Sequence, residues 1–246
     1  MSSLVINSKI WGEMFGTREM SGIFSDKKTI QYYLEVEAAL ARVQSRLGII
    51  PKSCGLEISK VAKTDWIDWK LLEKRTSIVG YPILPLVEQL SLKVKKNLGQ
   101  YCHWGATTQD IMDTADVLQI RDALSILLSD LVGIKKALKK LVKKYINTPM
   151  SGRTHLQHAL PTSFGYKCST WLSGIERHID RISQIKERLF YVSFFGAAGT
   201  LASLGEKDGL RTKNRLAKEL KLKSPSVSWH SIRDNFCELS SWISLV

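Results

Sequence analysis

Proline is scarce in this sequence, and its scarcity limits the folds that the chain can adopt. There are six prolines, and none lies between Leu86 and Thr148. Because proline breaks helices, so long a stretch without it favours long helices over a loop-rich β fold. Strand-like alternation of useful length is missing as well. We therefore predict an all-α chain.

Long apolar runs and paired cysteines are also absent. No apolar run reaches the ~18–20 residues that a membrane span needs, and Met1–Ser8 lacks the basic and then apolar pattern of a signal peptide. The four cysteines, at positions 54, 102, 168 and 237, form no C-x-x-C pair and no disulfide framework. We therefore expect a protein of the reducing cytoplasm that contacts no membrane, and we expect neither a metal nor a cofactor.

The charge balance is strongly basic, with 36 Lys and Arg against 23 Asp and Glu and a net charge of +13. Such a charge suits a nucleic-acid partner, and it equally suits an enzyme whose substrate carries several carboxylates. Six lysines cluster at positions 135, 136, 139, 140, 143 and 144. They lie outside the apolar pattern of their helix, where charged flanks are usually solvated. We expect no nucleic-acid partner, but a basic nucleic-acid-binding helical protein remains an alternative.

Short and medium helices are predicted for the first part of the chain. Apolar residues recur at helical spacing over residues 26–47, and Gly48 suits the end of that helix. The pattern over residues 56–75 predicts one or two short helices, and a further helix is predicted to run up to about Leu98. We assign residues 1–99 to a small N-terminal helical domain.

Two unbroken heptad seams dominate the rest of the sequence. The first consists of Val117, Ile120, Leu124, Leu127, Leu131, Ile134, Leu138, Leu141 and Tyr145. The second consists of Phe164, Cys168, Trp171, Ile175, His178, Ile182, Ile185, Leu189 and Val192. The seams predict helices over about residues 110–146 and 164–192. These helices should run antiparallel, because the linker over residues 147–161 is short.

The C-terminal part continues with a surface helix predicted over residues 206–222 and a last helix that starts near Ser231. The apolar stripe of that last helix runs to Val246 without a cap, so we expect the chain to be incomplete. Residues 100–246 then form most of a long-helix bundle domain. One antiparallel pair cannot cover both apolar seams, so we also expect self-association.

The segment Cys102–Asp110 gathers groups that suit chemistry just before the first long helix. It holds His103, two hydroxyls, an amide and an acid. The free N–H groups and partial positive charge of a helix start can bind a carboxylate together with the hydroxyls of Thr107 and Thr108. Thr107 with Asp110 also resembles a capping box. An ordinary threonine cap beside a solvent-facing histidine is the alternative.

Two further segments have a residue composition that is typical neither of a buried core nor of a plain linker. Ser151–Pro161 holds an arginine, two histidines and a glutamine. Arginine can clamp a carboxylate with two hydrogen bonds, and histidine carries protons near neutral pH. A polar surface loop is the alternative. Phe195–Thr200 is rich in small residues, which let a ligand or a helix approach the backbone, or which simply form a tight turn.

Taken together, these segments resemble the fumarase/aspartase superfamily. His103–Ala115 is similar to its first signature region, and Gly152–Pro161 is similar to its second. The resemblance covers essentially the whole chain and also includes Gly16–Met20, Ile23–Asp26, Val36–Leu40, Phe195–Thr200 and Trp229–Asp234. Within the superfamily the chain most resembles 3-carboxy-cis,cis-muconate cycloisomerase, and next adenylosuccinate lyase.

Two positions favour different substrates within that superfamily. Tyr81-Pro82 stands in the place of a catalytic His-Asp pair of adenylosuccinate lyases, which argues against adenylosuccinate. His155 stands where bacterial cycloisomerases often carry tryptophan, which argues against carboxymuconate. The resemblance therefore leaves the substrate open.

The resemblance implies a reaction and a set of residue roles. A proton leaves, or joins, the carbon next to a carboxylate, and a C–N or C–O bond breaks or forms on the neighbouring carbon. His155 is implied as the general acid. The residues implied for substrate binding are His103, Thr107, Thr108, Arg153, Thr154, Gln157, Arg18 and Arg233.

The resemblance further implies a homotetramer whose active sites each draw on three subunits. Similar proteins continue for about as long again and carry a mobile Gly-Ser-Ser-x-Met-Pro-x-Lys-x-Asn-Pro loop, whose serine supplies the general base. No such run occurs in this sequence. A fragment, a truncated gene product or a non-catalytic remnant is therefore a further alternative.

Overall fold

The computed structural model describes residues 5, 8 and 10–246, and the chain forms two compact units. Most of Met1–Ser8, where we expect no signal peptide, lies outside the described residues. The first unit takes the described residues up to Asp122 together with Phe190–Arg233, and the second takes Ala123–Leu189 and Asp234–Val246. Helix α7 (Thr108–Tyr145) supplies residues to both units. The domain boundary expected after residue 99 stays a prediction.

Helix α3 (Asp26–Leu47) forms the centre of the first unit. The Ser25 hydroxyl caps its start by accepting the N–H of Lys28, and Gly48 ends it with φ of 73°. Both ends therefore lie where the sequence predicts them. Helices α4 (Cys54–Val61) and α9 (Glu206–Glu219) pack against α3, so most of its side chains are buried.

The other helices of the first unit are short. They are α1 (Gly12–Phe15), α2 (Arg18–Ile23), η2 (Thr64–Trp66), α5 (Trp69–Val79), α6 (Ile83–Lys93) and η3 (Gly99–Tyr101). Helix α6 ends at Lys93 rather than near Leu98. The reason is local, because Val94 is extended, with φ of −71° and ψ of 128°, and so leaves the helix. Lys96 and Asn97 then adopt left-handed φ values of 61° and 56°, which prevent a right-handed helix from resuming.

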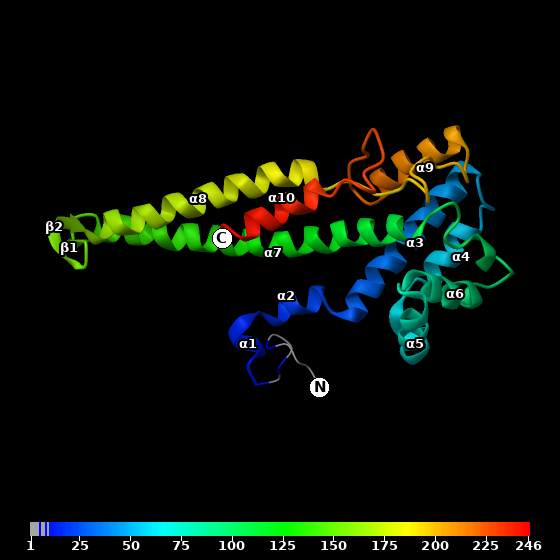
Figure 1. Cartoon of the computed structure of the whole chain (residues 1–246), viewed down its shortest axis with the longest axis horizontal. Coiled ribbons are helices and arrows are strands. Elements are labelled where there is room, and N and C mark those ends of the chain that lie inside the picture. Colours follow the sequence, from blue (N-terminus) through cyan, green and yellow to red (C-terminus); the bar gives the residue numbers. More distant parts are fainter. Residues whose placement is uncertain (1–4, 6–7, 9) are drawn as a thin grey trace. The chain divides into compact units, whose positions relative to one another are not determined.

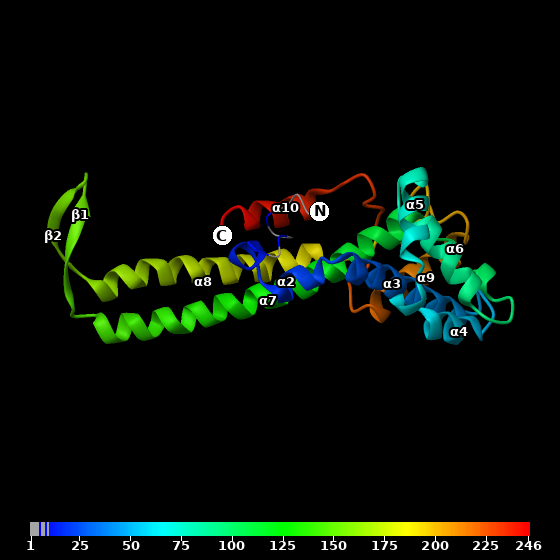
Figure 2. The same ribbon diagram turned by 90° about the horizontal axis from the view of Figure 1, so that it is seen from below.

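In the second unit the later part of α7 and helix α8 (Phe164–Leu189) lie side by side and antiparallel (Figures 1 and 2). Lys135 Nζ of α7 lies 3.0 Å from Glu176 Oε1 of α8. Nearer the connection between the helices, the ring centroids of Tyr145 and Phe164 are 5.4 Å apart. The predicted antiparallel pair is therefore confirmed. Helix α10 (Asp234–Ile243) packs against α8 and begins three residues later than expected.

The apolar seams of the second unit are only partly covered. Leu131 and Ile182 are buried, whereas Ile134 exposes 44% and Trp171 exposes 50% of its surface.

Among the described helices, none is both long and apolar enough to cross a membrane. The cytoplasmic location stays a prediction.

The segment between α7 and α8 is a β-hairpin, so the expectation of a strand-free linker over residues 147–161 is wrong. Strand β1 (Pro149–Thr154) pairs antiparallel with β2 (Gln157–Ser163), with a bulge between Ser151 and Arg153. Both strands are largely exposed or half-buried along their length. Because neither face packs on a core, the strands need no alternation of apolar and polar residues. Apart from this hairpin, the described architecture is helical as predicted.

Candidate active site

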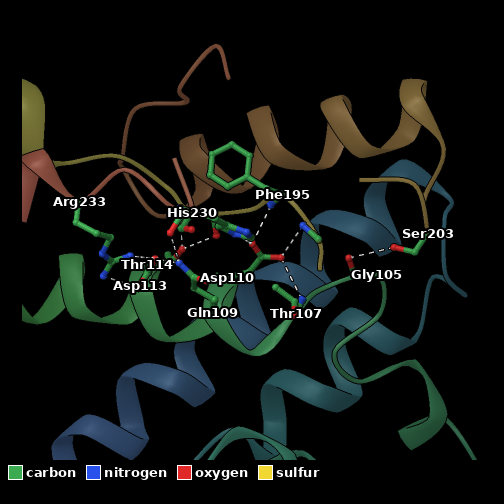
Figure 3. A network of polar contacts seen from close by, with 12 residues as sticks. Gly105, Thr107, Gln109, Asp110, Asp113, Thr114, Phe195, Ser203, His230 and Arg233 are labelled. Carbon is green, nitrogen blue, oxygen red and sulfur yellow. Dashed lines mark hydrogen bonds and ion pairs between the residues drawn. The ribbon is translucent and has the colours of Figure 1, made fainter. Parts of the chain in front are cut away.

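Asp110, in the first turn of α7, is fully buried and accepts four hydrogen bonds (Figure 3). Its Oδ1 accepts the N–H of Phe195 at 2.8 Å and Nε2–H of His230 at 2.9 Å. Its Oδ2 accepts the N–H of Gly196 at 3.0 Å and of Thr107 at 3.1 Å. The bond from Thr107 is the carboxylate half of the predicted capping box. One acidic side chain therefore fixes the helix start against two distant segments.

Asp113, one turn further along α7, holds Arg233. Its carboxylate accepts two hydrogen bonds from the Arg233 guanidinium, at 2.5 and 3.1 Å, and one from Gln109 Nε2 at 3.1 Å. Gln109 Nε2 also donates to the carbonyl of His230 at 2.8 Å. A two-point pairing of this kind fixes the plane of the guanidinium as well as its position. Arg233, still partly exposed, is thus oriented next to the start of α7.

His103 lies in the loop before α7 and is held by α3. Its backbone N–H donates to Glu37 Oε2 at 3.1 Å, and its ring Nδ1 lies 2.6 Å from Glu37 Oε1. The side chain of His103 is 21% exposed, and that of Glu37 is buried. The alternative of a simple solvent-facing histidine is therefore wrong.

The small residues after Phe195 form a tight turn. Gly196 and Gly199 adopt left-handed φ values of 71° and 78°. Glycine reaches this region without steric cost, which is why the turn is built from such residues. The turn aims the N–H groups of Phe195 and Gly196 at Asp110.

The second signature region lies on the hairpin of the second unit. His155 and Leu156 form its two-residue turn, with φ values of 42° and 64°. Left-handed backbone at residues other than glycine costs free energy and often marks functional sites. A pocket of about 360 Å³ lies at this turn. It is lined by Arg153, Thr154, His155, Leu156, Gln157 and His158.

Gly152 permits the bulge that precedes this turn. A Cβ at this position would lie 2.5 Å from the carbonyl oxygen of Leu160, which leaves no space for a side chain. On the same strand pair, Ser151 Oγ lies 2.9 Å from Nδ1 of His158. The glycine of the signature is thus needed for close backbone approach rather than for an unusual φ.

The predicted site residues fall separately on the two units. The first unit holds Arg18, His103, Thr107, Thr108 and Arg233, and the second holds Arg153, Thr154, His155 and Gln157. The structure gathers Thr107, Thr108 and Arg233 around the start of α7. It places Arg18 at the start of α2, exposed and hydrogen-bonded to Glu13 Oε1 at 2.5 Å.

Four residues that organise the site were not predicted from the sequence to be catalytic or substrate-binding: Glu37, Asp110, Asp113 and His230. Each acts through a partner that is distant in the sequence, apart from the capping bond of Asp110. Spacing along the chain does not identify such partners. The available signals were the capping box and the presence of all four residues in segments that resemble the superfamily.

The sequence profile of a protein family described as "Lyase" matches residues 15–246. The chain belongs to this lyase family. The proteins that this chain is similar to are named for several different reactions.

Trans-aconitate decarboxylase 1 of Mycosarcoma maydis is 43% identical over 95% of this chain and 47% of its own length. Adenylosuccinate lyase of Pyrococcus abyssi is 38% identical over 94% of this chain and 51% of its own length.

Solved structures of the lyase family match the fold closely. The crystal structure of fumarate lyase from Mesorhizobium sp. BNC1 has a TM-score of 0.90 and 50% identity, covering 94% of this chain and 54% of that one. The β-carboxy-cis,cis-muconate cycloisomerase of Acinetobacter calcoaceticus sp. ADP1 has a TM-score of 0.93 and 38% identity, covering 96% and 56%. The resemblance to the fumarase/aspartase superfamily is therefore confirmed. The chain spans about half the length of the relatives that it matches.

Proposed function

We propose that this lyase-family chain supplies the substrate-binding part of an active site for a polycarboxylate, most like that of 3-carboxy-cis,cis-muconate cycloisomerase. The observation that carries the proposal is the ordered start of α7. There Arg233 and the His103 ring are held by the carboxylates of Asp113 and Glu37, beside the helix start fixed by Asp110. The names of the similar proteins support the proposal, because the compound in each name carries two or more carboxylates.

The start of α7 suits a carboxylate on electrostatic grounds. The N-terminus of a helix carries partial positive charge and unpaired N–H groups. The hydroxyls of Thr107 and Thr108 and the charge of Arg233 add hydrogen-bond donors in the same unit. On the hairpin, Arg153, Thr154 and Gln157 offer a second group of donors for a carboxylate. In the proposed tetramer these two groups come from different subunits.

The proposed reaction removes a proton from the carbon next to a substrate carboxylate. The electron pair left behind is delocalised into that carboxylate and then forms the new double bond as a C–O or C–N bond breaks on the neighbouring carbon. His155 donates a proton to the leaving atom. The serine base implied by the superfamily is not in this sequence, so this chain alone should turn over substrate poorly.

An adenylosuccinate-lyase-like C–N lyase is the alternative within the family. The similarity to the Pyrococcus abyssi enzyme supports it, and Tyr81-Pro82 argues against it. Parallel assays of the protein in its native assembly, on 3-carboxy-cis,cis-muconate and on adenylosuccinate, separate the two. We expect measurable conversion of carboxymuconate only. Conversion of adenylosuccinate alone would replace the first proposal, and conversion of neither would favour a non-catalytic remnant.

Self-association is part of the proposal. Ile134, Leu141 and Trp171 stay at least one-third exposed on the helices of the second unit, and such apolar stripes are usually buried between copies of a chain. We expect a tetramer in sedimentation at micromolar concentration. A clean monomer would contradict this.

Nucleic-acid binding is the alternative outside the enzyme class. Two lysines of the cluster, Lys135 and Lys139, lie 3.0 and 3.5 Å from Glu176, which lowers the positive charge of that face. We expect at most weak binding to random duplex DNA at 150 mM salt. Tight binding with a steep salt dependence would support the alternative.

A further inference from the structure

Glu37 is a buried carboxylate that the proposed chemistry does not use. It lies on α3 and is 2% exposed, between apolar neighbours of the helix. Burying a carboxylate is costly unless its oxygens are hydrogen-bonded. Both oxygens of Glu37 have the same partner residue, since Oε2 accepts the N–H of His103 and Oε1 contacts its ring Nδ1.

This geometry determines where the His103 ring carries its proton. An ionised carboxylate can only accept hydrogen bonds, so at 2.6 Å from Glu37 Oε1 the ring Nδ1 must be the donor. The nitrogen that gains or loses a proton is therefore Nε2. Because the same carboxylate also holds the backbone of His103, the ring has little freedom to turn away.

The loop around His103 is held in an otherwise unfavourable conformation. His103 has φ of 58°, in the left-handed region that costs free energy for a residue with a side chain, whereas Gly105 reaches φ of 72° without that cost. Gln44, two helical turns after Glu37 on α3, donates from Nε2 to the carbonyl of Trp104 at 2.8 Å. Residues on one face of α3 thus compensate for backbone strain that would otherwise relax.

The electrostatic surroundings favour a protonated ring. Burial lowers the pKa of His103, but the charge and hydrogen bond of Glu37 from α3, together with the charge of Asp110 from α7, outweigh it and raise the pKa above its ordinary value. Cys102 beside it stays neutral, because burial raises the pKa of its thiol to about 12.

We propose that Glu37 is a positioning residue that keeps the His103 proton on Nδ1 and presents Nε2–H to a carboxylate of the substrate. The proposal rests on the proposed function, because it takes the ligand of His103 from there. A purely structural alternative exists, in which Glu37 only fastens the loop to α3. The two differ in what happens to the titration of His103 when the charge of Glu37 is removed.

The first test measures the ring nitrogens of His103 by ¹⁵N NMR in the wild-type protein, with His103→Gln used to assign the signal. We expect the neutral form to carry its proton on Nδ1. A neutral form protonated mainly on Nε2 would overturn the proposal. Since this measurement needs only the wild-type protein, it decides the point even if a Glu37 variant does not fold.

The second test compares Glu37→Gln with Glu35→Gln. Glu35 lies on the same helix but is exposed, so its variant removes the same charge without touching His103. We expect Glu37→Gln to lower the pKa of His103 by about 1–2 units, and Glu35→Gln to leave it unchanged. An unchanged pKa in Glu37→Gln would show a purely structural role and overturn the proposal.

The third test adds fumarate as a dicarboxylate probe. We expect fumarate to shift the His103 Nε2 signal, and Glu37→Gln to weaken binding about tenfold at pH 8 but less at pH 6. Binding without any shift of Nε2 would overturn the proposal while leaving the proposed function intact. No binding by the wild-type protein would instead contradict the proposed function, and the substrate half of this inference with it.

Discussion

The ring of His230 donates a hydrogen bond from Nε2 to Oδ1 of Asp110 at 2.9 Å, across 120 positions of the sequence. The same oxygen accepts the N–H of Phe195. The buried carboxylate is thus shared between the start of α7, the glycine-rich turn and the segment that carries Arg233. Asp110 therefore ties the segment that carries Arg233 to the start of α7, where Asp113 orients the guanidinium.

Replacing Asp110 with asparagine should destabilise the protein by about 3 kcal/mol. The amide has one oxygen for four donors, and its NH₂ group would face the N–H of Gly196 or Phe195. Urea unfolding measures the loss. Asp130→Asn, at an exposed position of the same helix, is the control and should change stability by less than about 0.5 kcal/mol. Equal effects of the two variants would contradict the anchoring role.

Asp116 should make stability depend on pH in the acid range. Burial and the neighbouring charge of Asp113 raise the pKa of Asp116 from 3.8 to about 6, although Arg233 lowers it. Because the folded-state pKa lies above the unfolded value, the stability linked to protonated Asp116 is fully present below pH 3.8 and is lost as the pH rises through about 6.

Asp116→Asn should therefore stabilise the protein at pH 7 by about 1–2 kcal/mol, allowing for solvent screening, and should have little effect at pH 4. Urea midpoints at the two pH values measure the difference. If Asp116→Asn stabilises the protein equally at pH 4 and pH 7, or destabilises it at pH 7, then ionised Asp116 does not destabilise the folded protein.

The hairpin turn should gain stability when its strain is removed. Leu156 is fully exposed and has φ of 64°, so Leu156→Gly relieves an unfavourable backbone at no packing cost. We expect a gain of about 0.5–1 kcal/mol in local stability. The matched control is Leu160→Gly, on strand β2 and also exposed, which should weaken the hairpin. Amide hydrogen exchange of the hairpin measures the local stability of both variants. A lower local stability in Leu156→Gly would mean that the turn is not strained.

The helices could be predicted from the sequence because their information is local. The heptad seams predicted the two long helices, and the short linker between them predicted their antiparallel arrangement. Helical spacing with Gly48 predicted the extent of α3, and the Thr107–Asp110 capping box marks the start of α7. The hairpin could not be predicted in this way. Its strands have no buried face, and its turn uses His155-Leu156 instead of the glycine-containing pairs typical of such turns.

The candidate site was predictable in the residues proposed to contact substrate, but not in the acids that hold them. His103, Arg153 and Arg233 belong to residue types that carry chemistry, so composition and motif resemblance single them out. Glu37 and Asp113 were missed because a buried acid in a helix is conspicuous only when its cationic or N–H partner is known. Those partners lie 66 and 120 positions away.

The residue roles on the hairpin stay predictions, and one comparison separates them. Arg153→Ala removes a charged clamp and should abolish fumarate binding. His155→Ala should spare binding and remove whatever turnover the protein has, because it removes only the acid. Arg177→Ala is the control, since Arg177 is exposed on α8 and its guanidinium donates to Ser173 within the same helix.

Calorimetric titration of fumarate into the wild-type protein and these three variants, in the assembly that the protein forms, tests the polycarboxylate site most directly. We expect saturable binding by the wild type, Arg177→Ala and His155→Ala, and no measurable binding by Arg153→Ala. No binding by the wild type, or equal binding by Arg153→Ala and the wild type, would contradict a polycarboxylate site built on these residues.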